Sequence, residues 1–173
     1  MVGKWRLLSI LLCATDWCAY GRLVDTPQPS VVLKDQICFA LYRASRAVTA
    51  RYRPMLERMG ITYPQLLALM VLWEEDGLTV REMSDRLDLD SGTMTPMLKR
   101  LAALDLVTRE RDPEDERLVR IRLTEAGRAL EQPACGVSEM MIGALALDMP
   151  QFTALKDQLE ELTAQVSDYK MAR

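Results

Sequence analysis

The chain has 173 residues, 49% of them hydrophobic, and a formal net charge of −3. This length suits one domain with a sizeable core, or a domain with added dimerisation helices, and the acidic balance means that nucleic-acid binding has to be judged from local charge. The absence of histidine excludes Ser-His-Asp and Cys-His nucleophile systems, and four cysteines without a CxxC pair favour neither a zinc ribbon nor a thioredoxin-like site, so we expect no metal and no cofactor.

Residues 1–30 differ in character from the rest of the chain. The stretch MVGKWRLLSILLCA has a basic start and a short apolar run, as a signal peptide has, but the run is too short to span a bilayer. We expect a disordered extension that ends in the Pro-Gln-Pro-Ser linker at 27–30. An exported or membrane-associated protein is the alternative that this run suggests.

Apolar periodicity predicts the next helices. Residues 31–53 repeat apolar side chains at helical spacing, and Pro54 is expected to break or restart the chain. A short helical segment then ends at Gly60, a plausible C′ glycine. Thr62 is expected to cap a further helix, which Gly77 ends.

Residues 79–123 contain two short helices and a hairpin. Thr79 and Glu82 form a capping box before the first helix. Asp90 or Ser91 begins the second, which runs to about Leu104. Pro96 conflicts with an early start unless regular helix begins near Gly92 or a kink is tolerated.

Two alternating runs follow this helix pair. Residues 106–111 and 118–123 are predicted strands, joined by a turn that begins at Asp112-Pro113. Two helices and a hairpin in this order indicate a winged helix-turn-helix, whose second helix enters the major groove of DNA.

The C-terminal part is expected to be helical. Thr124 opens a helix toward Leu130, which Pro133 and Gly136 disturb, and a final helix covers about 150–166. Helices at both ends of a winged helix commonly build a dimer base. The predicted fold class is therefore mainly α with a small β-hairpin wing, a winged helix-turn-helix with N- and C-terminal dimerisation helices.

The second helix of the pair has the composition of a DNA-reading helix. Its first residues, SGTMT, are small and polar and can approach base edges, and Lys99 and Arg100 can reach the DNA backbone. In the hairpin turn, Asp115 can hold Arg117 by a charge-assisted bond and order it for the minor groove. Segment 91–122 carries seven basic and six acidic residues, a net +1, so an ordinary amphipathic helix and a solvated hairpin tip remain alternatives.

Taken together, DSGTMTPMLKRL and RERDPEDERLVRIRLTEAGRAL resemble the MarR family of winged-helix repressors, in which the DER of the wing and the following LTEAG are hallmarks. The upstream stretch QICFALYRASRAVTARYRPMLERMGITYPQLLALMVLWEEDGLTV resembles the organic-hydroperoxide-sensing OhrR branch. The resemblance covers about residues 33–131. It implies a domain over 31–170, with dimerisation helices over 31–60 and 124–170 and the winged helix-turn-helix over 61–123.

The resemblance also implies a function and a set of residues. It implies a cytoplasmic homodimeric repressor, not an enzyme, that binds a pseudo-palindromic double-stranded DNA operator, senses organic hydroperoxides through Cys38 and has no membrane partner. The sensor tyrosines of the family are matched by Tyr42, Tyr52 and Tyr63. The DNA-reading positions carry over to Ser91, Thr93, Thr95, Asp115 and Arg117.

The spacing around Cys38 supports redox chemistry. Tyr42 follows one helical turn later, so its hydroxyl can donate toward a thiolate and favour that form. Tyr52 lies near the same helix face but about 21 Å further along the axis, at about 1.5 Å per residue. It could reach Cys38 of a partner subunit if the two first helices ran antiparallel across a twofold axis.

Several alternatives stay open at this point. Cys135 is the candidate resolving thiol, and the alternative is a small thiol that caps oxidised Cys38, with Cys135 spare in a flexible connection. Cys13 and Cys18 are expected to have no role. A MarR-type regulator released by a phenolic or other small ligand, with Cys38 structural, is the alternative within the fold, and a thiol peroxidase is the alternative outside it.

Overall fold

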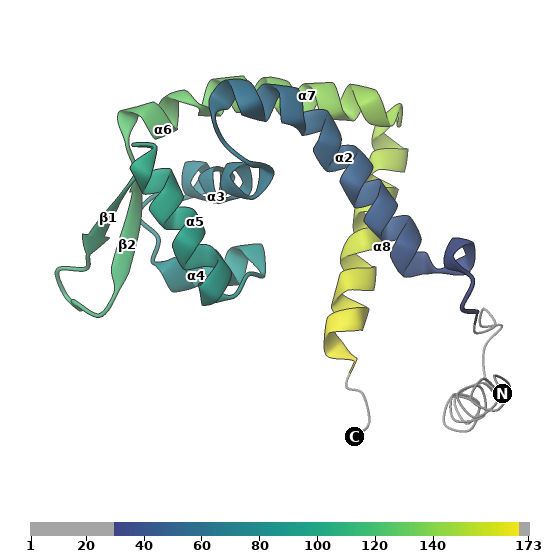
Figure 1. Cartoon of the computed structure of the whole chain (residues 1–173), viewed down its shortest axis with the longest axis horizontal. Coiled ribbons are helices and arrows are strands. Elements are labelled where there is room, and N and C mark those ends of the chain that lie inside the picture. The colour runs from purple at the N-terminus through teal and green to yellow at the C-terminus, as the bar shows by residue number, and fades with distance from the viewer. Residues whose placement is uncertain (1–29, 170–173) are drawn as a thin grey trace, which may run out of the picture. The chain divides into compact units, whose positions relative to one another are not determined.

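The computed structural model describes residues 30–169, except for the side chains of residues 137 and 138. The expectations for residues 1–29 lie outside this range. The chain divides after Arg43 into two parts, which are described separately. Figure 1 labels the helices and strands of both parts.

The part before Arg43 contains a 3-10 turn, η1 (Leu33–Asp35), and the first turns of α2 (Ile37–Met59). The prediction that the helix starts at Val31 was wrong, because the chain is still extended at Val32 and Gln36. The Ser30 hydroxyl accepts from the N–H of Val32 at 3.1 Å and donates to Asp35 at 2.9 Å. Such side-chain bonds compete with the helix ladder and delay its start.

The helix α2 continues through Pro54, so the predicted break was wrong. Proline removes one helical donor, and here its ring is exposed while Leu56, two residues on, is buried in the core. Packing of this last turn outweighs the lost hydrogen bond. Gly60 ends the helix with a φ of 70°, as predicted.

The part after Arg43 contains the winged helix-turn-helix. Its elements are α3 (Tyr63–Glu74), α4 (Val80–Leu87), α5 (Ser91–Ala103), β1 (Val107–Arg111) and β2 (Val119–Leu123). The two strands pair antiparallel with Val107 opposite Leu123 and Arg111 opposite Val119. The predicted order of two short helices and a hairpin is confirmed (Figure 1).

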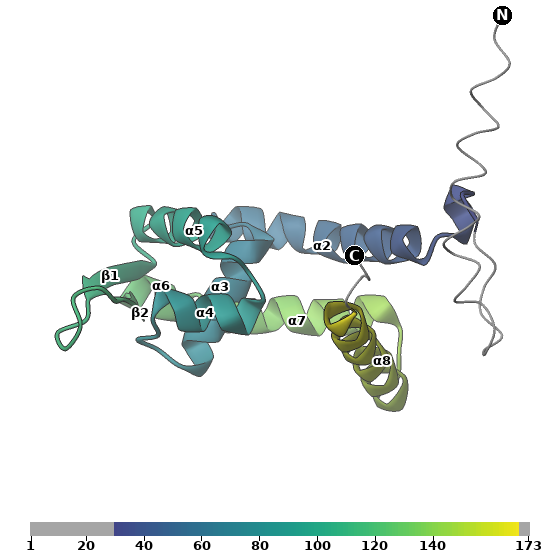
Figure 2. The same cartoon turned by 90° about the horizontal axis from the view of Figure 1, so that it is seen from below.

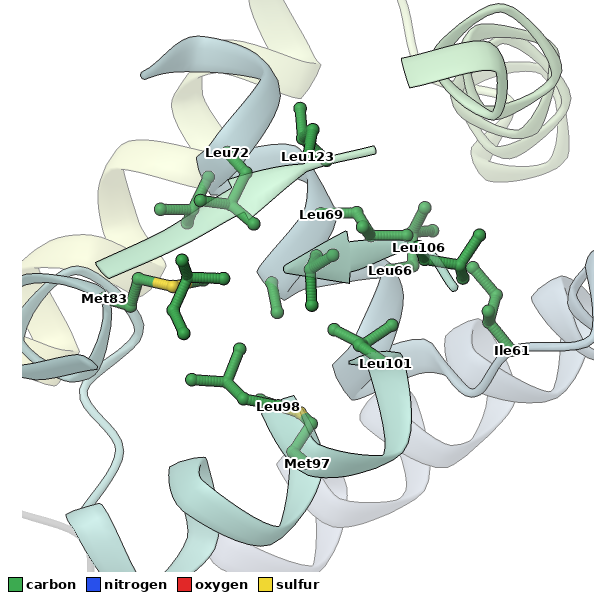
Figure 3. Packing of buried hydrophobic residues seen from close by; sticks show 14 of the residues in the cluster. Ile61, Leu66, Leu69, Leu72, Met83, Met97, Leu98, Leu101, Leu106 and Leu123 are labelled. Atoms are coloured by element: carbon green, nitrogen blue, oxygen red, sulfur yellow. The ribbon is translucent and has the colours of Figure 1, made fainter. Parts of the chain in front are cut away.

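Apolar side chains from all five of these elements form one core. Figure 3 shows α3, α4, α5 and the hairpin contributing to it. The largest side chains in it are almost fully inaccessible to solvent: Leu69, Leu72, Met83, Met94, Leu98, Leu101 and Ile121. This burial is the main stabilising contribution to the unit, and it fixes the faces that α5 and the wing leave exposed.

Side-chain caps set the helix starts. The N–H of Thr79 donates to the Glu82 carboxylate at 2.7 Å, and the N–H of Glu82 returns to the Thr79 hydroxyl at 3.3 Å, so the predicted capping box is confirmed. Gly77 has a φ of 81°, which favours glycine, in the turn between α3 and α4. Asp88, also left-handed at a φ of 50°, ends α4.

Asp76 connects the α3–α4 turn to the hairpin. Its carboxylate accepts the N–H of Leu123 at 2.9 Å and pairs with Arg128 at 2.8 Å. Burial raises the pKa of Asp76, but the Leu123 N–H, the Arg128 guanidinium and the N–H of Gly77 more than offset it and hold that pKa below its usual value.

Three helices follow the hairpin: α6 (Glu125–Ala129), α7 (Glu131–Leu145) and α8 (Met149–Asp168). The prediction that Pro133 and Gly136 disturb the helix was wrong for α7, which contains both. Pro133 is the third residue of α7, where the N–H groups have no partner in the helix and their loss costs little. Figure 2 shows α7 leading away from the hairpin base and α8 turning from its end.

Candidate nucleic-acid interface and redox cysteine

The start of α5 is held by its own cap. The Asp90 carboxylate accepts the N–H of Thr93 at 2.9 Å and the hydroxyl of Thr93 at 2.9 Å. These two bonds, the hydroxyl first, hold the pKa of Asp90 below its usual value. The helix therefore begins at Ser91, as predicted, and it continues through Pro96, so the early start and this proline are compatible.

One face of α5 is buried and the other is free. Met94, Met97, Leu98 and Leu101 are in the core, whereas the predicted DNA-reading residues are on the solvent side. Thr95 is half-buried, and its predicted companions are exposed: Ser91, Thr93, Lys99 and Arg100. The hydroxyl of Thr93 is also committed to Asp90, so it contributes to the cap as well as to the exposed surface.

The wing is a tight loop closed by hydrogen bonds. The N–H of Asp112 donates to the carbonyl of Leu118 at 3.0 Å, and the N–H of Leu118 donates to the carbonyl of Asp115 at 2.9 Å. The prediction that Asp115 holds the guanidinium of Arg117 was wrong, because Asp115 bonds the backbone of Arg117 instead. The Asp115 carboxylate accepts the N–H of Arg117 at 3.0 Å, which leaves the guanidinium exposed.

An open hollow of about 590 Å³ separates the wing from the helix pair. Ser91 and Thr95 of α5 line one side, and Arg117 of the wing lines the other. Arg81 of α4 and Arg109 of β1 also line it, and neither was predicted as a DNA contact. Strand alternation gave no signal for Arg109, because it shares a face with the buried Val107 and yet is exposed.

Cys38 is the second residue of α2, and its side chain is exposed. Tyr42 follows one turn later and is 55% exposed. The N–H groups at the start of a helix have no partner within it and favour negative charge nearby. The thiol thus combines accessibility with a helix start, two conditions typical of reactive cysteines.

Tyr52 and Tyr63 lie together in the part of the chain after Arg43. Their ring centroids are 4.9 Å apart with the planes tilted by 35°, and both rings pack on the core. Burial, and then the neighbouring Tyr63, raise the pKa of Tyr52 above its usual value. A tyrosine hydroxyl can donate a hydrogen bond, and burial favours this protonated form further.

Cys135 is exposed on α7, so the alternative that placed it in a flexible connection was wrong about the local structure. Cys38 and Cys135 are both free thiols, and Cys13 and Cys18 lie outside the described residues. Within residues 30–169, no group of cysteines and carboxylates is arranged to hold a metal ion. None of the helices in that range combines the length and apolar character of a membrane span.

Comparison with known proteins identifies the relatives of this chain. The family of SarA/Rot transcriptional regulators matches residues 50–132. The organic hydroperoxide resistance transcriptional regulator of Bacillus subtilis is 46% identical over 130 residues, which are 75% of this chain and 88% of that protein. The reduced, DNA-bound structure of AbfR from Staphylococcus epidermidis is 37% identical with a TM-score of 0.68, over 78% of this chain and 92% of that one.

Two further structures complete the comparison. The disulfide form of AbfR aligns with a TM-score of 0.55 at 38% identity, over 78% of this chain and 90% of that one. A MarR transcriptional regulator from Methanosarcina mazei aligns with a TM-score of 0.66 at 29% identity, over 75% of this chain and 94% of that one. These relatives include transcriptional regulators, and the solved structures among them share the fold of this chain. The chain belongs to the MarR family of winged-helix transcriptional regulators, in the branch of the organic hydroperoxide resistance regulators.

Proposed function

We propose that this protein is a DNA-binding repressor that senses organic hydroperoxides by oxidation of Cys38 and then releases its operator. The observation that carries the proposal is an exposed thiol in the first turn of α2, with Tyr42 one turn on, in a chain 46% identical to an organic hydroperoxide resistance regulator. Its site of action is the cytoplasm, where thiols stay reduced until an oxidant arrives.

The DNA contact uses α5 and the wing. The start of α5, with exposed Ser91 and Thr93 and half-buried Thr95, enters the major groove, and Lys99 and Arg100 contact phosphates. Asp115 orders the loop, and Arg117 reaches the minor groove from the far side of the hollow.

Dimerisation makes the operator a pseudo-palindrome. The helix α8 leaves an apolar stripe exposed, with Leu155 at 42%, Leu159 at 43% and Val166 at 66%. An apolar stripe of this kind is buried when a second copy packs on it. A twofold dimer then presents two reading helices to successive major grooves of double-stranded DNA.

The redox step begins with attack by the Cys38 thiolate on the terminal oxygen of the hydroperoxide. The S–O bond forms as the O–O bond breaks, and the alkoxide leaves as an alcohol after taking up a proton. Sulfur loses two electrons and becomes a sulfenic acid, and the peroxide is reduced. Tyr42 supports the thiolate by hydrogen bonding, and Tyr52 and Tyr63 support Cys38 of the partner subunit.

The sulfenic acid then condenses with a thiol to give a disulfide and water. Cys135 is the internal candidate for this thiol, because it is free and exposed on a regular helix. A small cellular thiol is the alternative. Either product adds bulk or a covalent link near the dimerisation helices, which displaces the two reading helices from the spacing that DNA requires.

The experiment measures fluorescence anisotropy of a labelled operator, selected by the protein from a random DNA library, before and after adding cumene hydroperoxide. The wild type should release the DNA, and Cys38→Ser should retain it. Cys135→Ser is the matched control, and mass spectrometry of the same samples identifies the oxidised sulfur. Release that persists in Cys38→Ser would exclude the redox proposal and favour a regulator released by a bound phenolic ligand. Steady turnover of hydroperoxide with a thiol reductant would favour a thiol peroxidase instead.

A further inference from the structure

A buried carboxylate lies at the base of the wing. Asp112 is only 4% exposed, although its neighbours in the loop are exposed. Its carboxylate accepts the N–H of Glu114 at 2.8 Å and the N–H of Asp115 at 3.2 Å, and it forms an ion pair with Arg120 of β2. These three partners compensate the cost of burying a charged carboxylate at the base of the wing.

Arg120 carries the connection onward to the helix pair. Its guanidinium donates to the carbonyl of Gly77 at 3.0 Å, in the turn between α3 and α4. The neighbouring N–H of Ile121 donates to the carbonyl of Leu78 at 2.8 Å, and Thr79 bridges to Arg120 in the manner of a third strand. The wing base is therefore attached to the body of the domain at more than one point.

The same bonds continue toward the tip. Asp112 holds the N–H of Asp115, and Asp115 in turn holds the N–H of Arg117. A continuous series of hydrogen bonds thus runs from Gly77 through Arg120 and Asp112 to the backbone of Arg117. The guanidinium of Arg117 stays exposed at the rim of the hollow, where it can contact DNA.

We propose that Asp112 and Arg120 are positioning residues for Arg117: they fix the wing to the α3–α4 turn so that Arg117 is presented to DNA in one place. This inference rests on the proposed function. A wing that could swing would have to be ordered at the moment of binding, which weakens the complex without removing any contacting side chain.

The test is a double-mutant cycle on operator binding. Asp112→Asn keeps the size of the side chain and an acceptor for the loop N–H groups, but it turns an amide toward Arg120 and loses the ion pair. It is combined with Arg117→Ala. Glu75→Gln, which removes an exposed ion pair with Arg86 away from the wing, is the control. Operator affinity, its dependence on salt concentration and the melting temperature are measured for each reduced protein.

Asp112→Asn should weaken operator binding by about tenfold and lower the slope of log affinity against log salt by about one, as Arg117→Ala does. The two effects should not add, so the double variant should resemble Arg117→Ala alone. Glu75→Gln should leave affinity and slope unchanged. A merely structural role would lower the melting temperature and leave the salt slope where it was.

Additive effects, or an unchanged salt slope in Asp112→Asn, would overturn the inference. Arg120→Lys, which keeps the charge but loses the guanidinium bond to Gly77, repeats the cycle should Asp112→Asn fold poorly. Full operator affinity in Arg117→Ala would instead show that the wing does not contribute to operator binding, which contradicts the proposed function. This outcome can be distinguished from failure of the inference because it appears in the Arg117→Ala single variant.

Discussion

Two glycines in neighbouring helices should respond to alanine with opposite signs. Gly127 is buried in α6, and a Cβ atom there would lie 2.0 Å from the carbonyl oxygen of Leu106 and 3.2 Å from the Leu123 side chain. Gly136 is exposed in α7, and a Cβ atom there would meet nothing within 4 Å. Both residues are in regular helix, so alanine gains similar helix propensity at each position. The difference between the two variants therefore reports the close contact of residue 127 with the Leu106 carbonyl.

The cost at Gly127 follows from what surrounds it. The Leu106 carbonyl already accepts the N–H of Thr124 at 3.1 Å, and the Gly127 carbonyl accepts the Trp73 indole N–H at 3.1 Å. Because the clash is with backbone, α6 has to move and both bonds are disturbed. Overpacking costs about 1–3 kcal/mol and each net hydrogen bond about 1 kcal/mol, while alanine regains about 1 kcal/mol of helix propensity. The expected net loss is about 3 kcal/mol.

Gly136→Ala should instead stabilise the protein by about 0.5–1 kcal/mol, because it reduces backbone freedom without a clash. Urea unfolding followed by circular dichroism measures both, at one fixed protein concentration because dimerisation contributes to stability. With a slope of about 1–3 kcal/mol per molar urea, a loss of about 3 kcal/mol moves the midpoint down by at least about 1 M. A Gly127→Ala midpoint within about 0.2 M of the wild type would refute the reasoning.

The other predictions concern the thiol, the core and acid stability. Tyr42→Phe should slow oxidation of Cys38, because a donor to the thiolate is removed, and alkylation of the remaining thiol over time measures the rate, with the exposed Tyr169→Phe as control. Leu98→Ala should cost about 2–5 kcal/mol in urea unfolding, because the side chain is 0% exposed in the core. The pKa of Asp76 is lower in the folded state than in the unfolded state. The contribution of its carboxylate to the free energy of unfolding is therefore complete above the unfolded pKa of about 3.9 and is lost as pH falls through the lower folded pKa. Asp76→Asn should make the free energy of unfolding depend less on pH in this window.

The fold was largely predictable because its signals are local. The capping box at Thr79, the cap at Asp90 and the left-handed glycine at Gly60 each depend on residues within four positions. Apolar periodicity identified the helix pair and the hairpin in the same way. The errors at Pro54 and Pro133 share one cause. The prediction took into account the hydrogen-bond donor that proline lacks. It did not take into account tertiary packing at Pro54 or the first-turn position of Pro133, which make that loss small.

The candidate site was predictable only where the apolar pattern of a helix shows which of its residues are exposed. The residues of α5 are on the expected side because the apolar positions fix the orientation of the helix. The bond from Asp115 goes to the backbone of Arg117 and not to its guanidinium, since the loop closes more tightly than the spacing shows. Asp112 depends on Arg120, eight residues away, and Arg120 depends on Gly77, forty-three residues away. Sequence spacing carries no signal for such contacts.

The small charge of the reading surface has a consequence for the proposed switch. Segment 91–122 has a net charge of only +1, so general attraction to phosphates contributes little to DNA affinity. Little affinity would therefore remain once the reading helices no longer match the grooves of the operator. In the proposed function, binding would then depend on correctly placed contacts from α5 and Arg117, and a modest shift of the two reading helices would remove them together. A strongly basic surface would keep the displaced protein on nearby DNA, where it could still block transcription. In the proposed switch, low local charge and a wing fixed by Asp112 and Arg120 would both favour binding in one geometry and release in another.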